Sequence, residues 1–255
     1  DFLTKKVQLT LLGIGNPPYA VNDPKTCQAL GLSLSTQPGN SPVTPAAEIL
    51  WQTPIVYSQL TNRSISPIRN ELEVYFSKIK KGLDASQWAA WQEALSRRFS
   101  LIWGPPGTGK SHTLRAIVLG AVLDAHLNRQ PLRLLITANT YNAIDNVLLE
   151  LEKELKILLP TKPYSLYRIQ SKWNPIPEEI GLKYPDLINL PLNKATPSAD
   201  IISFLERLNE PSGILIVGCP PQQLHNLSVA GKNNERPKDT IKSWFDLIIL
   251  DEASQ

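Results

Sequence analysis

A glycine-rich run near the middle of the chain has the spacing of a phosphate-binding loop rather than of a chance turn. It satisfies the pattern G-x-x-x-x-G-K-[ST] and reads Gly104-Pro105-Pro106-Gly107-Thr108-Gly109-Lys110-Ser111. Its glycines let backbone N–H groups turn inward around β- and γ-phosphates, and a helix opening at Lys110 adds the positive end of its dipole. Lys110 offers a charge to the phosphates and Ser111 a hydroxyl to Mg²⁺. These residues are the predicted nucleotide ligands, together with the adjacent His112, for which no catalytic role is expected.

Two neighbouring carboxylates follow the last apolar run of the chain. Asp251 and Glu252 come directly after residues 245–250, which have the pattern of a buried strand. Asp251 is expected to hold Mg²⁺, directly or through water, and Glu252 to orient or deprotonate the attacking water. The alternative is an ordinary solvated strand end. With the phosphate loop upstream, the predicted catalytic residues are Lys110, Asp251 and Glu252.

The segments around these residues alternate between strand and helix patterns. Residues Ile144, Leu148, Leu151 and Leu155, for example, recur at helical spacing along one stripe. Strands alternating with helices predict an α/β fold with a parallel sheet flanked by helices, whose ligands bind at the carboxyl ends of the strands. We expect strands at 99–103, 133–138, 164–169, 213–219 and 245–250, and helices at 67–81, 84–97, 110–128, 142–158 and 199–208.

The composition changes along the chain and suggests two parts. Residues 1–65 are rich in Pro, Gly, Asn, Ser and Thr, which predicts a small loop-rich β element or the tail of a preceding domain. Residues 66–255 are expected to form the incomplete α/β lobe. Within it, residues 171–198 hold five prolines and little periodicity, which favours a long loop or an inserted segment.

The overall composition excludes several classes of protein. With 42% hydrophobic residues the chain can bury a core, and its net charge of +3 permits a polyanionic partner without requiring one. Cys27 and Cys219 match no metal or redox spacing, so both are expected to be reduced in a cytoplasmic or nuclear protein. No apolar run approaches the roughly 18 residues of a membrane span, and no signal peptide is visible. A first residue Asp1 and the lack of methionine favour an excerpted segment.

The two nucleotide motifs resemble those of the Upf-like branch of superfamily 1 helicases, the senataxin and mu-binding type. The resemblance rests on Gly-Pro-Pro-Gly-Thr-Gly-Lys at 104–110 and Asp-Glu-Ala-Ser-Gln at 251–255. Residues 83–87 resemble a motif upstream of the phosphate loop, whose glutamine, here Gln87, reads the adenine. A helical glutamine is otherwise usually solvated. The resemblance covers about residues 83 to 255 and implies a RecA-like lobe that ends after the acidic strand.

Two further segments resemble the parts of such helicases that grip nucleic acid. Residues 136–145, Ile-Thr-Ala-Asn-Thr-Tyr-Asn-Ala-Ile-Asp, resemble a segment that contacts the backbone, so Thr140 and Asn142 are the candidate nucleic-acid ligands. Residues 216–220 resemble the next backbone-contact motif. The chain departs from the family pattern at Asn139, where proline is usual, and at Tyr141, where asparagine is usual. Pro220 stands near a position often held by threonine and is not a candidate.

The resemblance implies an ATP- and Mg²⁺-dependent motor that moves on single-stranded DNA or RNA, with 5′ to 3′ polarity and a second RecA-like lobe. One alternative is another P-loop ATPase, such as an AAA-type remodeller, although the long separation of Lys110 from Asp251 and the Ala-Ser-Gln after the carboxylates favour the helicase. The second alternative is a nucleotide-binding module that is inactive in isolation. Three tryptophans, Trp88, Trp91 and Trp103, are expected in the core rather than stacked on bases.

Overall fold

The computed structural model describes residues 60, 61, 63, 65–105, 107–171, 175–193, 197–210, 212–232 and 244–251. Pro106 and Glu252 of the predicted site lie outside the described residues, as does nearly all of the N-terminal element expected over 1–65. The boundary between the two predicted parts therefore stays a prediction. No helix of the described part is long and apolar enough to cross a membrane.

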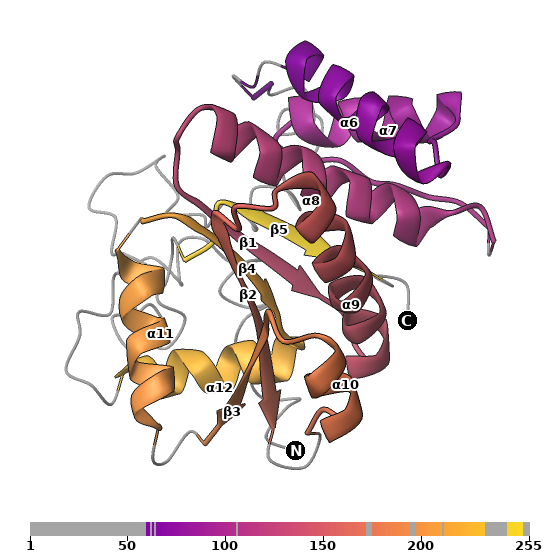
Figure 1. The fold of residues 1–255 in the computed structure, drawn as a ribbon. Helices are drawn as coiled ribbons and strands as arrows, with labels where there is room; N and C mark the ends of the chain where they lie inside the picture. Colours follow the sequence, from indigo (N-terminus) through magenta and orange to yellow (C-terminus); the bar gives the residue numbers. More distant parts are fainter. Residues whose placement is uncertain are drawn as a thin grey trace, which may run out of the picture. The chain divides into compact units, whose positions relative to one another are not determined.

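A five-stranded parallel sheet forms the centre of the described lobe, with the strand order β3-β2-β4-β1-β5. The fold is a RecA-like P-loop α/β fold, as the sequence predicted (Figure 1). Four of its strands had been expected within a few residues of their observed bounds. The strands are β1 (Leu132–Thr137), β2 (Tyr164–Ser171), β3 (Leu187–Leu192), β4 (Ile214–Gly218) and β5 (Leu247–Leu250).

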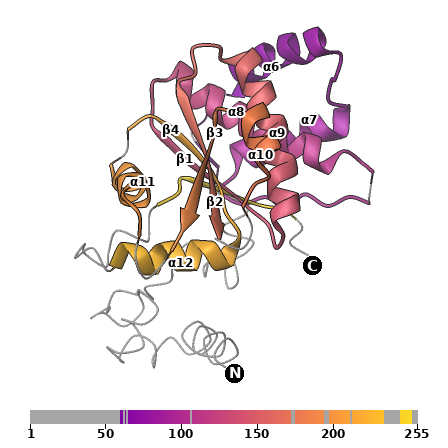
Figure 2. The same cartoon turned by 60° about the horizontal axis from the view of Figure 1, so that its bottom comes forward.

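Alternating side chains of the strands divide between two layers of helices. Leu134 and Ile136 of β1 belong to the core cluster shared with α8 (Lys110–Leu127) and α9 (Tyr141–Leu158). Leu135, one residue between them, is buried outside that cluster, because successive side chains of a strand point to opposite faces. Figure 2 shows α11 (Ala199–Asn209) across the strands from α8 and α9. The sheet is thus covered on both faces, as expected for parallel strands.

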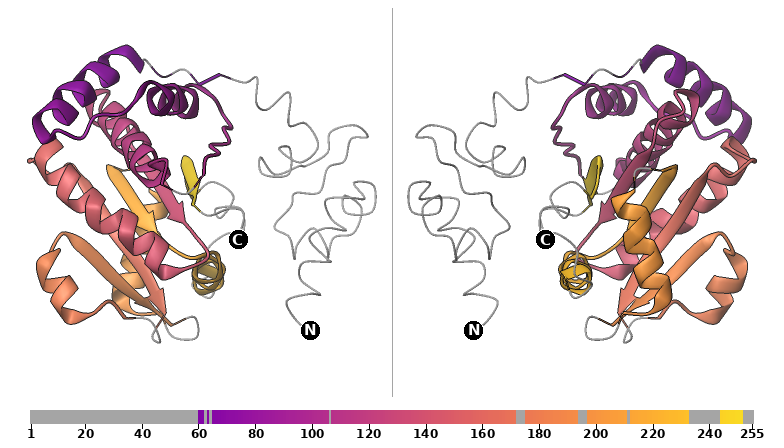
Figure 3. Two further views of the ribbon diagram at one scale, coloured as in Figure 1. Left: turned by 90° about the vertical axis from the view of Figure 1, so that its right-hand side faces the viewer. Right: turned by 90° about the vertical axis from the view of Figure 1, so that its left-hand side faces the viewer.

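Helices α6 (Ile65–Ile79) and α7 (Ala85–Ser96) pack on α8, on its side away from the sheet (Figure 3). The Trp91 side chain of α7 is fully buried and its Nε1 donates to the carbonyl of Ala116, 2.9 Å away. A Cβ atom on Gly120 would lie 2.8 Å from Leu95 and Trp91, so glycine allows α7 to approach α8 closely. Trp88 is partly buried and meets Trp91 edge to face, so these two tryptophans are core residues, as predicted.

The strand expected at 99–103 is wrong. These residues lie within the described range and form no strand, and Leu101 and Trp103 are 78% and 86% exposed. Arg97, two residues before this run, makes an isolated bridge to Leu60, while β5 pairs with β1 alone among the described strands. An apolar run becomes a strand only where a neighbour accepts its backbone hydrogen bonds, and no described strand does so here. The prediction that Trp103 lies in the core is wrong for the same reason.

The long loop expected over 171–198 is also wrong in part, because this segment contains α10 (Glu178–Lys183) and β3. Strand β3 pairs with β2 at the edge of the sheet, and Pro191 stands inside it. Proline is tolerated on an edge strand because its missing N–H is not needed by a further neighbour. Of the five prolines in this segment, Pro191 is thus compatible with regular structure because it lies in an edge strand. A further helix, α12 (Pro221–Lys232), follows β4.

Candidate nucleotide and nucleic-acid site

Three of the predicted motifs lie at the carboxyl edge of the sheet. Helix α8 ends shortly before β1 begins, so its first residue, Lys110, lies at the opposite end, where the strands finish. Thr140 follows the end of β1 and Asp251 follows the end of β5. These two strands are paired in register, and the Asp251 backbone N–H donates to the Thr137 carbonyl at 2.9 Å. The fold therefore brings the loop, Thr140 and Asp251 to one edge, where ligands of such sheets bind.

The phosphate loop has the backbone conformation that an anion site requires. Gly107 and Gly109 have φ values of 83° and 79°, in the left-handed region that favours glycine. Gly109 is the N-cap of α8 and provides no side-chain cap. The first N–H groups of a helix have no partner within it, so without a side-chain cap they are free to face an anion. The residues present therefore fit a phosphate group.

Lys110 is held by the carbonyls of its own loop. Its Nζ donates to the carbonyl oxygens of Gly104 at 2.6 Å and Pro105 at 3.0 Å, and the Thr108 hydroxyl also donates to Pro105, at 2.9 Å. An ammonium group has three protons, so at most one remains for a further acceptor in this arrangement. Lys110 can therefore donate to one phosphate oxygen as it stands, and a contact with a second phosphate oxygen would replace one of the loop carbonyls.

Gln87 lies against the phosphate loop. It is the third residue of α7, where Asp84 caps the helix and Gln87 completes a capping box by accepting from the Asp84 N–H at 3.0 Å. Its Nε2 donates to the carbonyl of Thr108 at 3.2 Å. Each end of the amide retains one unused donor or acceptor position. That remaining pair matches the N6 donor and N7 acceptor of adenine, which glutamine pairs bidentately.

Thr140 is the N-cap of α9, and its hydroxyl oxygen accepts from the Ala143 N–H at 3.3 Å. A hydroxyl that accepts in this way still has its proton to donate. The Thr140 and Asn142 side chains are both exposed at the start of the helix. The structure thus places both candidate nucleic-acid ligands together on the surface next to the carboxyl edge of β1.

The candidate Mg²⁺ ligands are the exposed Ser111 and the partly buried Asp251. Among the described residues no three His, Cys, Asp or Glu side chains gather into a metal-binding group. Mg²⁺ commonly takes one or two protein ligands and completes its octahedron with substrate phosphates and water, so two oxygens suffice. A serine hydroxyl and a carboxylate are hard oxygen donors that suit this ion.

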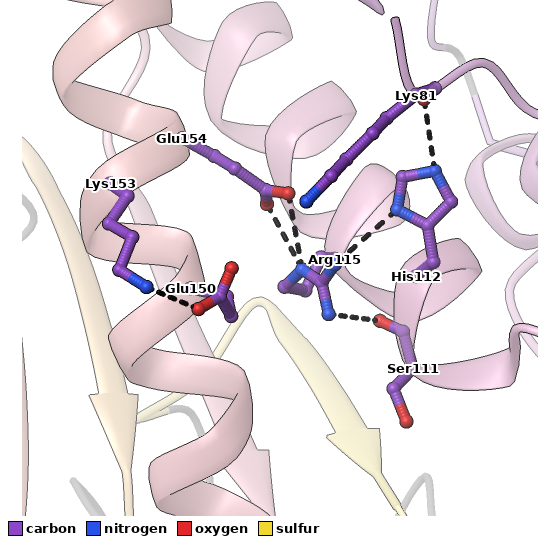
Figure 4. Close-up of polar contacts among 7 residues, drawn as sticks. All are labelled: Lys81, Ser111, His112, Arg115, Glu150, Lys153 and Glu154. Atoms are coloured by element: carbon purple, nitrogen blue, oxygen red, sulfur yellow. Dashed lines mark hydrogen bonds and ion pairs between the residues drawn. The ribbon is translucent and has the colours of Figure 1, made fainter. Parts of the chain in front are cut away.

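The His112 side chain lies in a polar cluster with Lys81, Arg115 and Glu154 (Figure 4). Its Nε2 lies 3.2 Å from the Lys81 carbonyl and its Nδ1 lies 3.4 Å from a guanidinium nitrogen of Arg115. Because a carbonyl only accepts and a guanidinium only donates, Nε2 carries the proton and Nδ1 is bare. Burial, supported by the Arg115 cation, lowers the pKa of His112. Both ring nitrogens have protein partners, and His112 stays a nucleotide ligand only as a prediction.

A second polar cluster, which was not predicted from the sequence, lies beside the start of α9. Arg168 on β2 is 2% exposed and donates from Nη2 to Asp145 at 2.9 Å and from Nη1 to Gln170 at 2.8 Å. Its guanidinium lies 4.6 Å from the ring centroid of Tyr141, whose hydroxyl accepts from the Ser171 N–H. The one sequence feature that could have indicated this cluster is Asp145, because it is a carboxylate close to the apolar stripe of α9. This cluster fixes the first turns of α9, which carry Thr140 and Asn142.

Comparisons with known proteins match the part of the chain that carries most of these residues. Residues 82–178 match the model of the AAA domain family. The "Helicase required for RNAi-mediated heterochromatin assembly 1" of Schizosaccharomyces pombe is 43% identical over 70 residues, 27% of this chain and 7% of that protein. The DNA replication ATP-dependent helicase/nuclease of Gallus gallus is 41% identical over 78 residues, 30% of this chain and 7% of that protein. An uncharacterized ATP-dependent helicase of Methanocaldococcus jannaschii is 37% identical over 83 residues, 32% of this chain and 12% of that protein. No solved structure matches the chain.

The aligned part of the chain spans 7% of the length of each of the first two relatives. The family match includes Gln87, the phosphate loop, Thr140 and Asn142, and Asp251 lies beyond it. The parallel sheet, the phosphate loop at its carboxyl edge and the helicase relatives together support a P-loop NTPase domain of the helicase type in this chain.

Proposed function

We propose that the chain is the ATP-binding motor lobe of a superfamily 1 helicase of the Upf-like type, which uses ATP hydrolysis to move along single-stranded DNA or RNA. The observation that carries the proposal is the common edge. The phosphate loop, the helicase-like segment around Thr140 and the acidic strand end at Asp251 meet where β1 and β5 finish. A motor requires its nucleotide and its track to contact neighbouring elements, so that one site responds to the other.

In this proposal each residue has a distinct task. Lys110 and the loop N–H groups bind the β- and γ-phosphates, and Ser111 and Asp251 would hold Mg²⁺, which neutralises charge on the phosphates. Glu252 orients or deprotonates the attacking water. Thr140 and Asn142 contact the nucleic-acid backbone. We further propose 5′ to 3′ movement, a second RecA-like lobe that completes the ATP site, and a cytoplasmic location, or a nuclear one in a eukaryote.

The test of the nucleic-acid assignment is binding of a single-stranded oligonucleotide. Affinity should fall as salt rises, because each neutralised phosphate releases counterions. Thr140→Ala should lower it roughly tenfold for all sequences alike, the effect of about 1.5 kcal/mol from a hydrogen bond to a charged group. Fluorescence anisotropy at several salt concentrations measures both effects.

Thr140→Ser is the matched control, because serine retains the hydroxyl and caps the helix at least as well. It should bind like the parent chain. Thermal melting separates a binding defect from loss of the α9 cap, which by itself costs about 1 kcal/mol. Binding that ignores both salt and Thr140→Ala would remove the assignment. It would leave an AAA-type remodeller, consistent with the description of the matching family.

Base selection provides a separate test of Gln87. If this side chain reads adenine, the chain should prefer ATP to GTP, and Gln87→Ala should remove most of that preference. Gly109→Ala should have a similar effect, because its Cβ would lie 2.5 Å from Gln87 Nε2 and displace the amide. Gly107→Ala is the control: it carries comparable backbone strain at φ 83° but has no atom within 4 Å of its Cβ.

Competition of ATP and GTP for a fluorescent ATP analogue measures the preference in each variant. Both glycine variants should bind nucleotide more weakly, by an amount set by about 1–2 kcal/mol of left-handed backbone strain. Gly109→Ala alone of the two should also lose selectivity. Equal affinity of the parent chain for ATP and GTP would exclude the adenine role of Gln87.

A further inference from the structure

Arg115 and Glu154 form an ion pair between the two helices of the candidate site. Arg115 lies on α8 and its Nε is 3.1 Å and 3.3 Å from the two carboxylate oxygens of Glu154 on α9. The two side chains are largely shielded from water, at 13% and 8% exposure. Burial raises the pKa of Glu154, and the Arg115 charge opposes that shift. Each of these two charges is stabilised by the other, because removing one member of the pair leaves the other buried and unpaired.

The same guanidinium reaches the first turn of the phosphate-loop helix. Its Nη1 donates to the Ser111 carbonyl at 3.4 Å, and another nitrogen contacts His112, which in turn donates to the Lys81 carbonyl (Figure 4). Arg115 therefore joins α9 to the backbone of the residue whose hydroxyl is the candidate Mg²⁺ ligand. The Lys81 side chain points toward Glu154 in the same view.

The other end of α9 carries the candidate nucleic-acid contacts. Thr140 caps the helix, and Glu154 is in its fourth turn, about 20 Å along the axis at 1.5 Å per residue. The helix is held between these points by a continuous buried stripe, Ile144, Leu148, Leu151 and Leu155. If bound nucleic acid displaces the first turn of α9, the movement is therefore carried along the helix to Glu154, because packed interiors do not absorb movement by compression.

We propose that Arg115 and Glu154 are positioning residues that couple nucleic-acid binding at the start of α9 to ATP binding at the phosphate loop. The proposal rests on the function proposed above. When α9 moves, Glu154 carries the Arg115 guanidinium with it, and Arg115 shifts the Ser111 backbone in the first turn of α8. The coupling acts in both directions, so ATP changes the affinity for nucleic acid by the same factor.

The experiment measures a ratio rather than an affinity. The dissociation constant of a fluorescent ATP analogue with Mg²⁺ is determined for the 255-residue chain, with and without a saturating single-stranded oligonucleotide. For the parent chain the two values should differ at least fivefold, the lower end of typical coupling. For Glu154→Gln, which keeps the shape and removes the charge, the ratio should approach one. The affinity for each ligand alone should stay within about threefold.

Two further variants keep the test decisive. Lys153→Gln removes the neighbouring ion pair on α9, in which Lys153 contacts Glu150 rather than α8, and should leave the ratio unchanged. The double variant Arg115→Met, Glu154→Leu replaces the pair with apolar groups, a change that often preserves stability. It should fold and still lose the coupling. Melting temperatures identify any variant that fails to fold.

The outcomes separate this inference from the proposed function. If the chain binds neither ATP nor the oligonucleotide, the proposed function fails. If it binds both and the ratio is one in the parent chain, or persists in Glu154→Gln and the double variant, the pair is a structural brace and the inference is overturned. A ratio lost equally in Lys153→Gln would also overturn it, because any charge change on α9 would then suffice.

Discussion

Replacing Lys110 with alanine is expected to weaken ATP–Mg²⁺ binding about 100-fold. The ammonium is the one positive side chain within the loop, and hydrogen bonds between charged partners contribute up to about 3 kcal/mol. In the structure Nζ contacts the carbonyls of Gly104 and Pro105, which leaves one proton for a phosphate oxygen. A contact with a second phosphate oxygen would replace one of these carbonyls, and alanine removes every contact of the ammonium.

Titration with a fluorescent ATP analogue measures this effect. Lys78→Ala is the matched control, since Lys78 is an exposed lysine in the last turn of α6 and lies outside the loop. It should bind like the parent chain. Equal affinity of the Lys110→Ala and parent proteins would show that the glycine-rich run is not a nucleotide site.

The largest expected effect on stability comes from Asp145→Asn. Asp145 is the carboxylate partner of the buried Arg168, which also donates to Gln170 and lies over Tyr141. Breaking a buried ion pair from one side costs about 3–5 kcal/mol. For a domain of this size each kcal/mol lowers the melting temperature by about 2–4 °C, so a decrease of about 10 °C is expected.

Thermal unfolding followed by circular dichroism provides the measurement. Glu73→Gln removes an ion pair with Arg69 on α6 that is 40% and 47% exposed, and should change the melting temperature little. If Asp145→Asn melts at the temperature of the parent chain, the guanidinium has another partner of equal strength and the cluster does not stabilise the start of α9.

Local patterns were sufficient for the parts of the fold that depend on neighbouring residues. The stripe of α9 and the alternation of strands with helices follow from spacing along the chain, and both were predicted. The run at 99–103 has the same apolar character as β1, yet it forms no strand, since strand formation depends on a distant partner. The segment 171–198 shows the reverse case, in which β2 supplies a partner for a proline-containing strand.

The candidate site likewise has some residues that could be predicted from the sequence and others that could not. The phosphate loop, Asp251 and Gln87 belong to short sequence motifs and were predicted from them. Arg115 and Glu154 lie 39 residues apart, and Asp145 and Arg168 lie 23 apart. Neither pair has a local pattern that distinguishes it from charged residues on a solvated helix face or strand. Their importance comes from burial, which only the folded arrangement specifies.

The turns that join helices to strands at the opposite edge of the sheet are convenient places for a spectroscopic probe. Asn128, Arg129 and Gln130 connect α8 to β1 and are all exposed. Strand β1 separates them from Thr140 by six residues, or about 20 Å. A dye attached through a cysteine at position 129 is therefore directly continuous with the helix that carries Lys110 but remote from the ligands. It would report movement of α8 during titration without competing for the site.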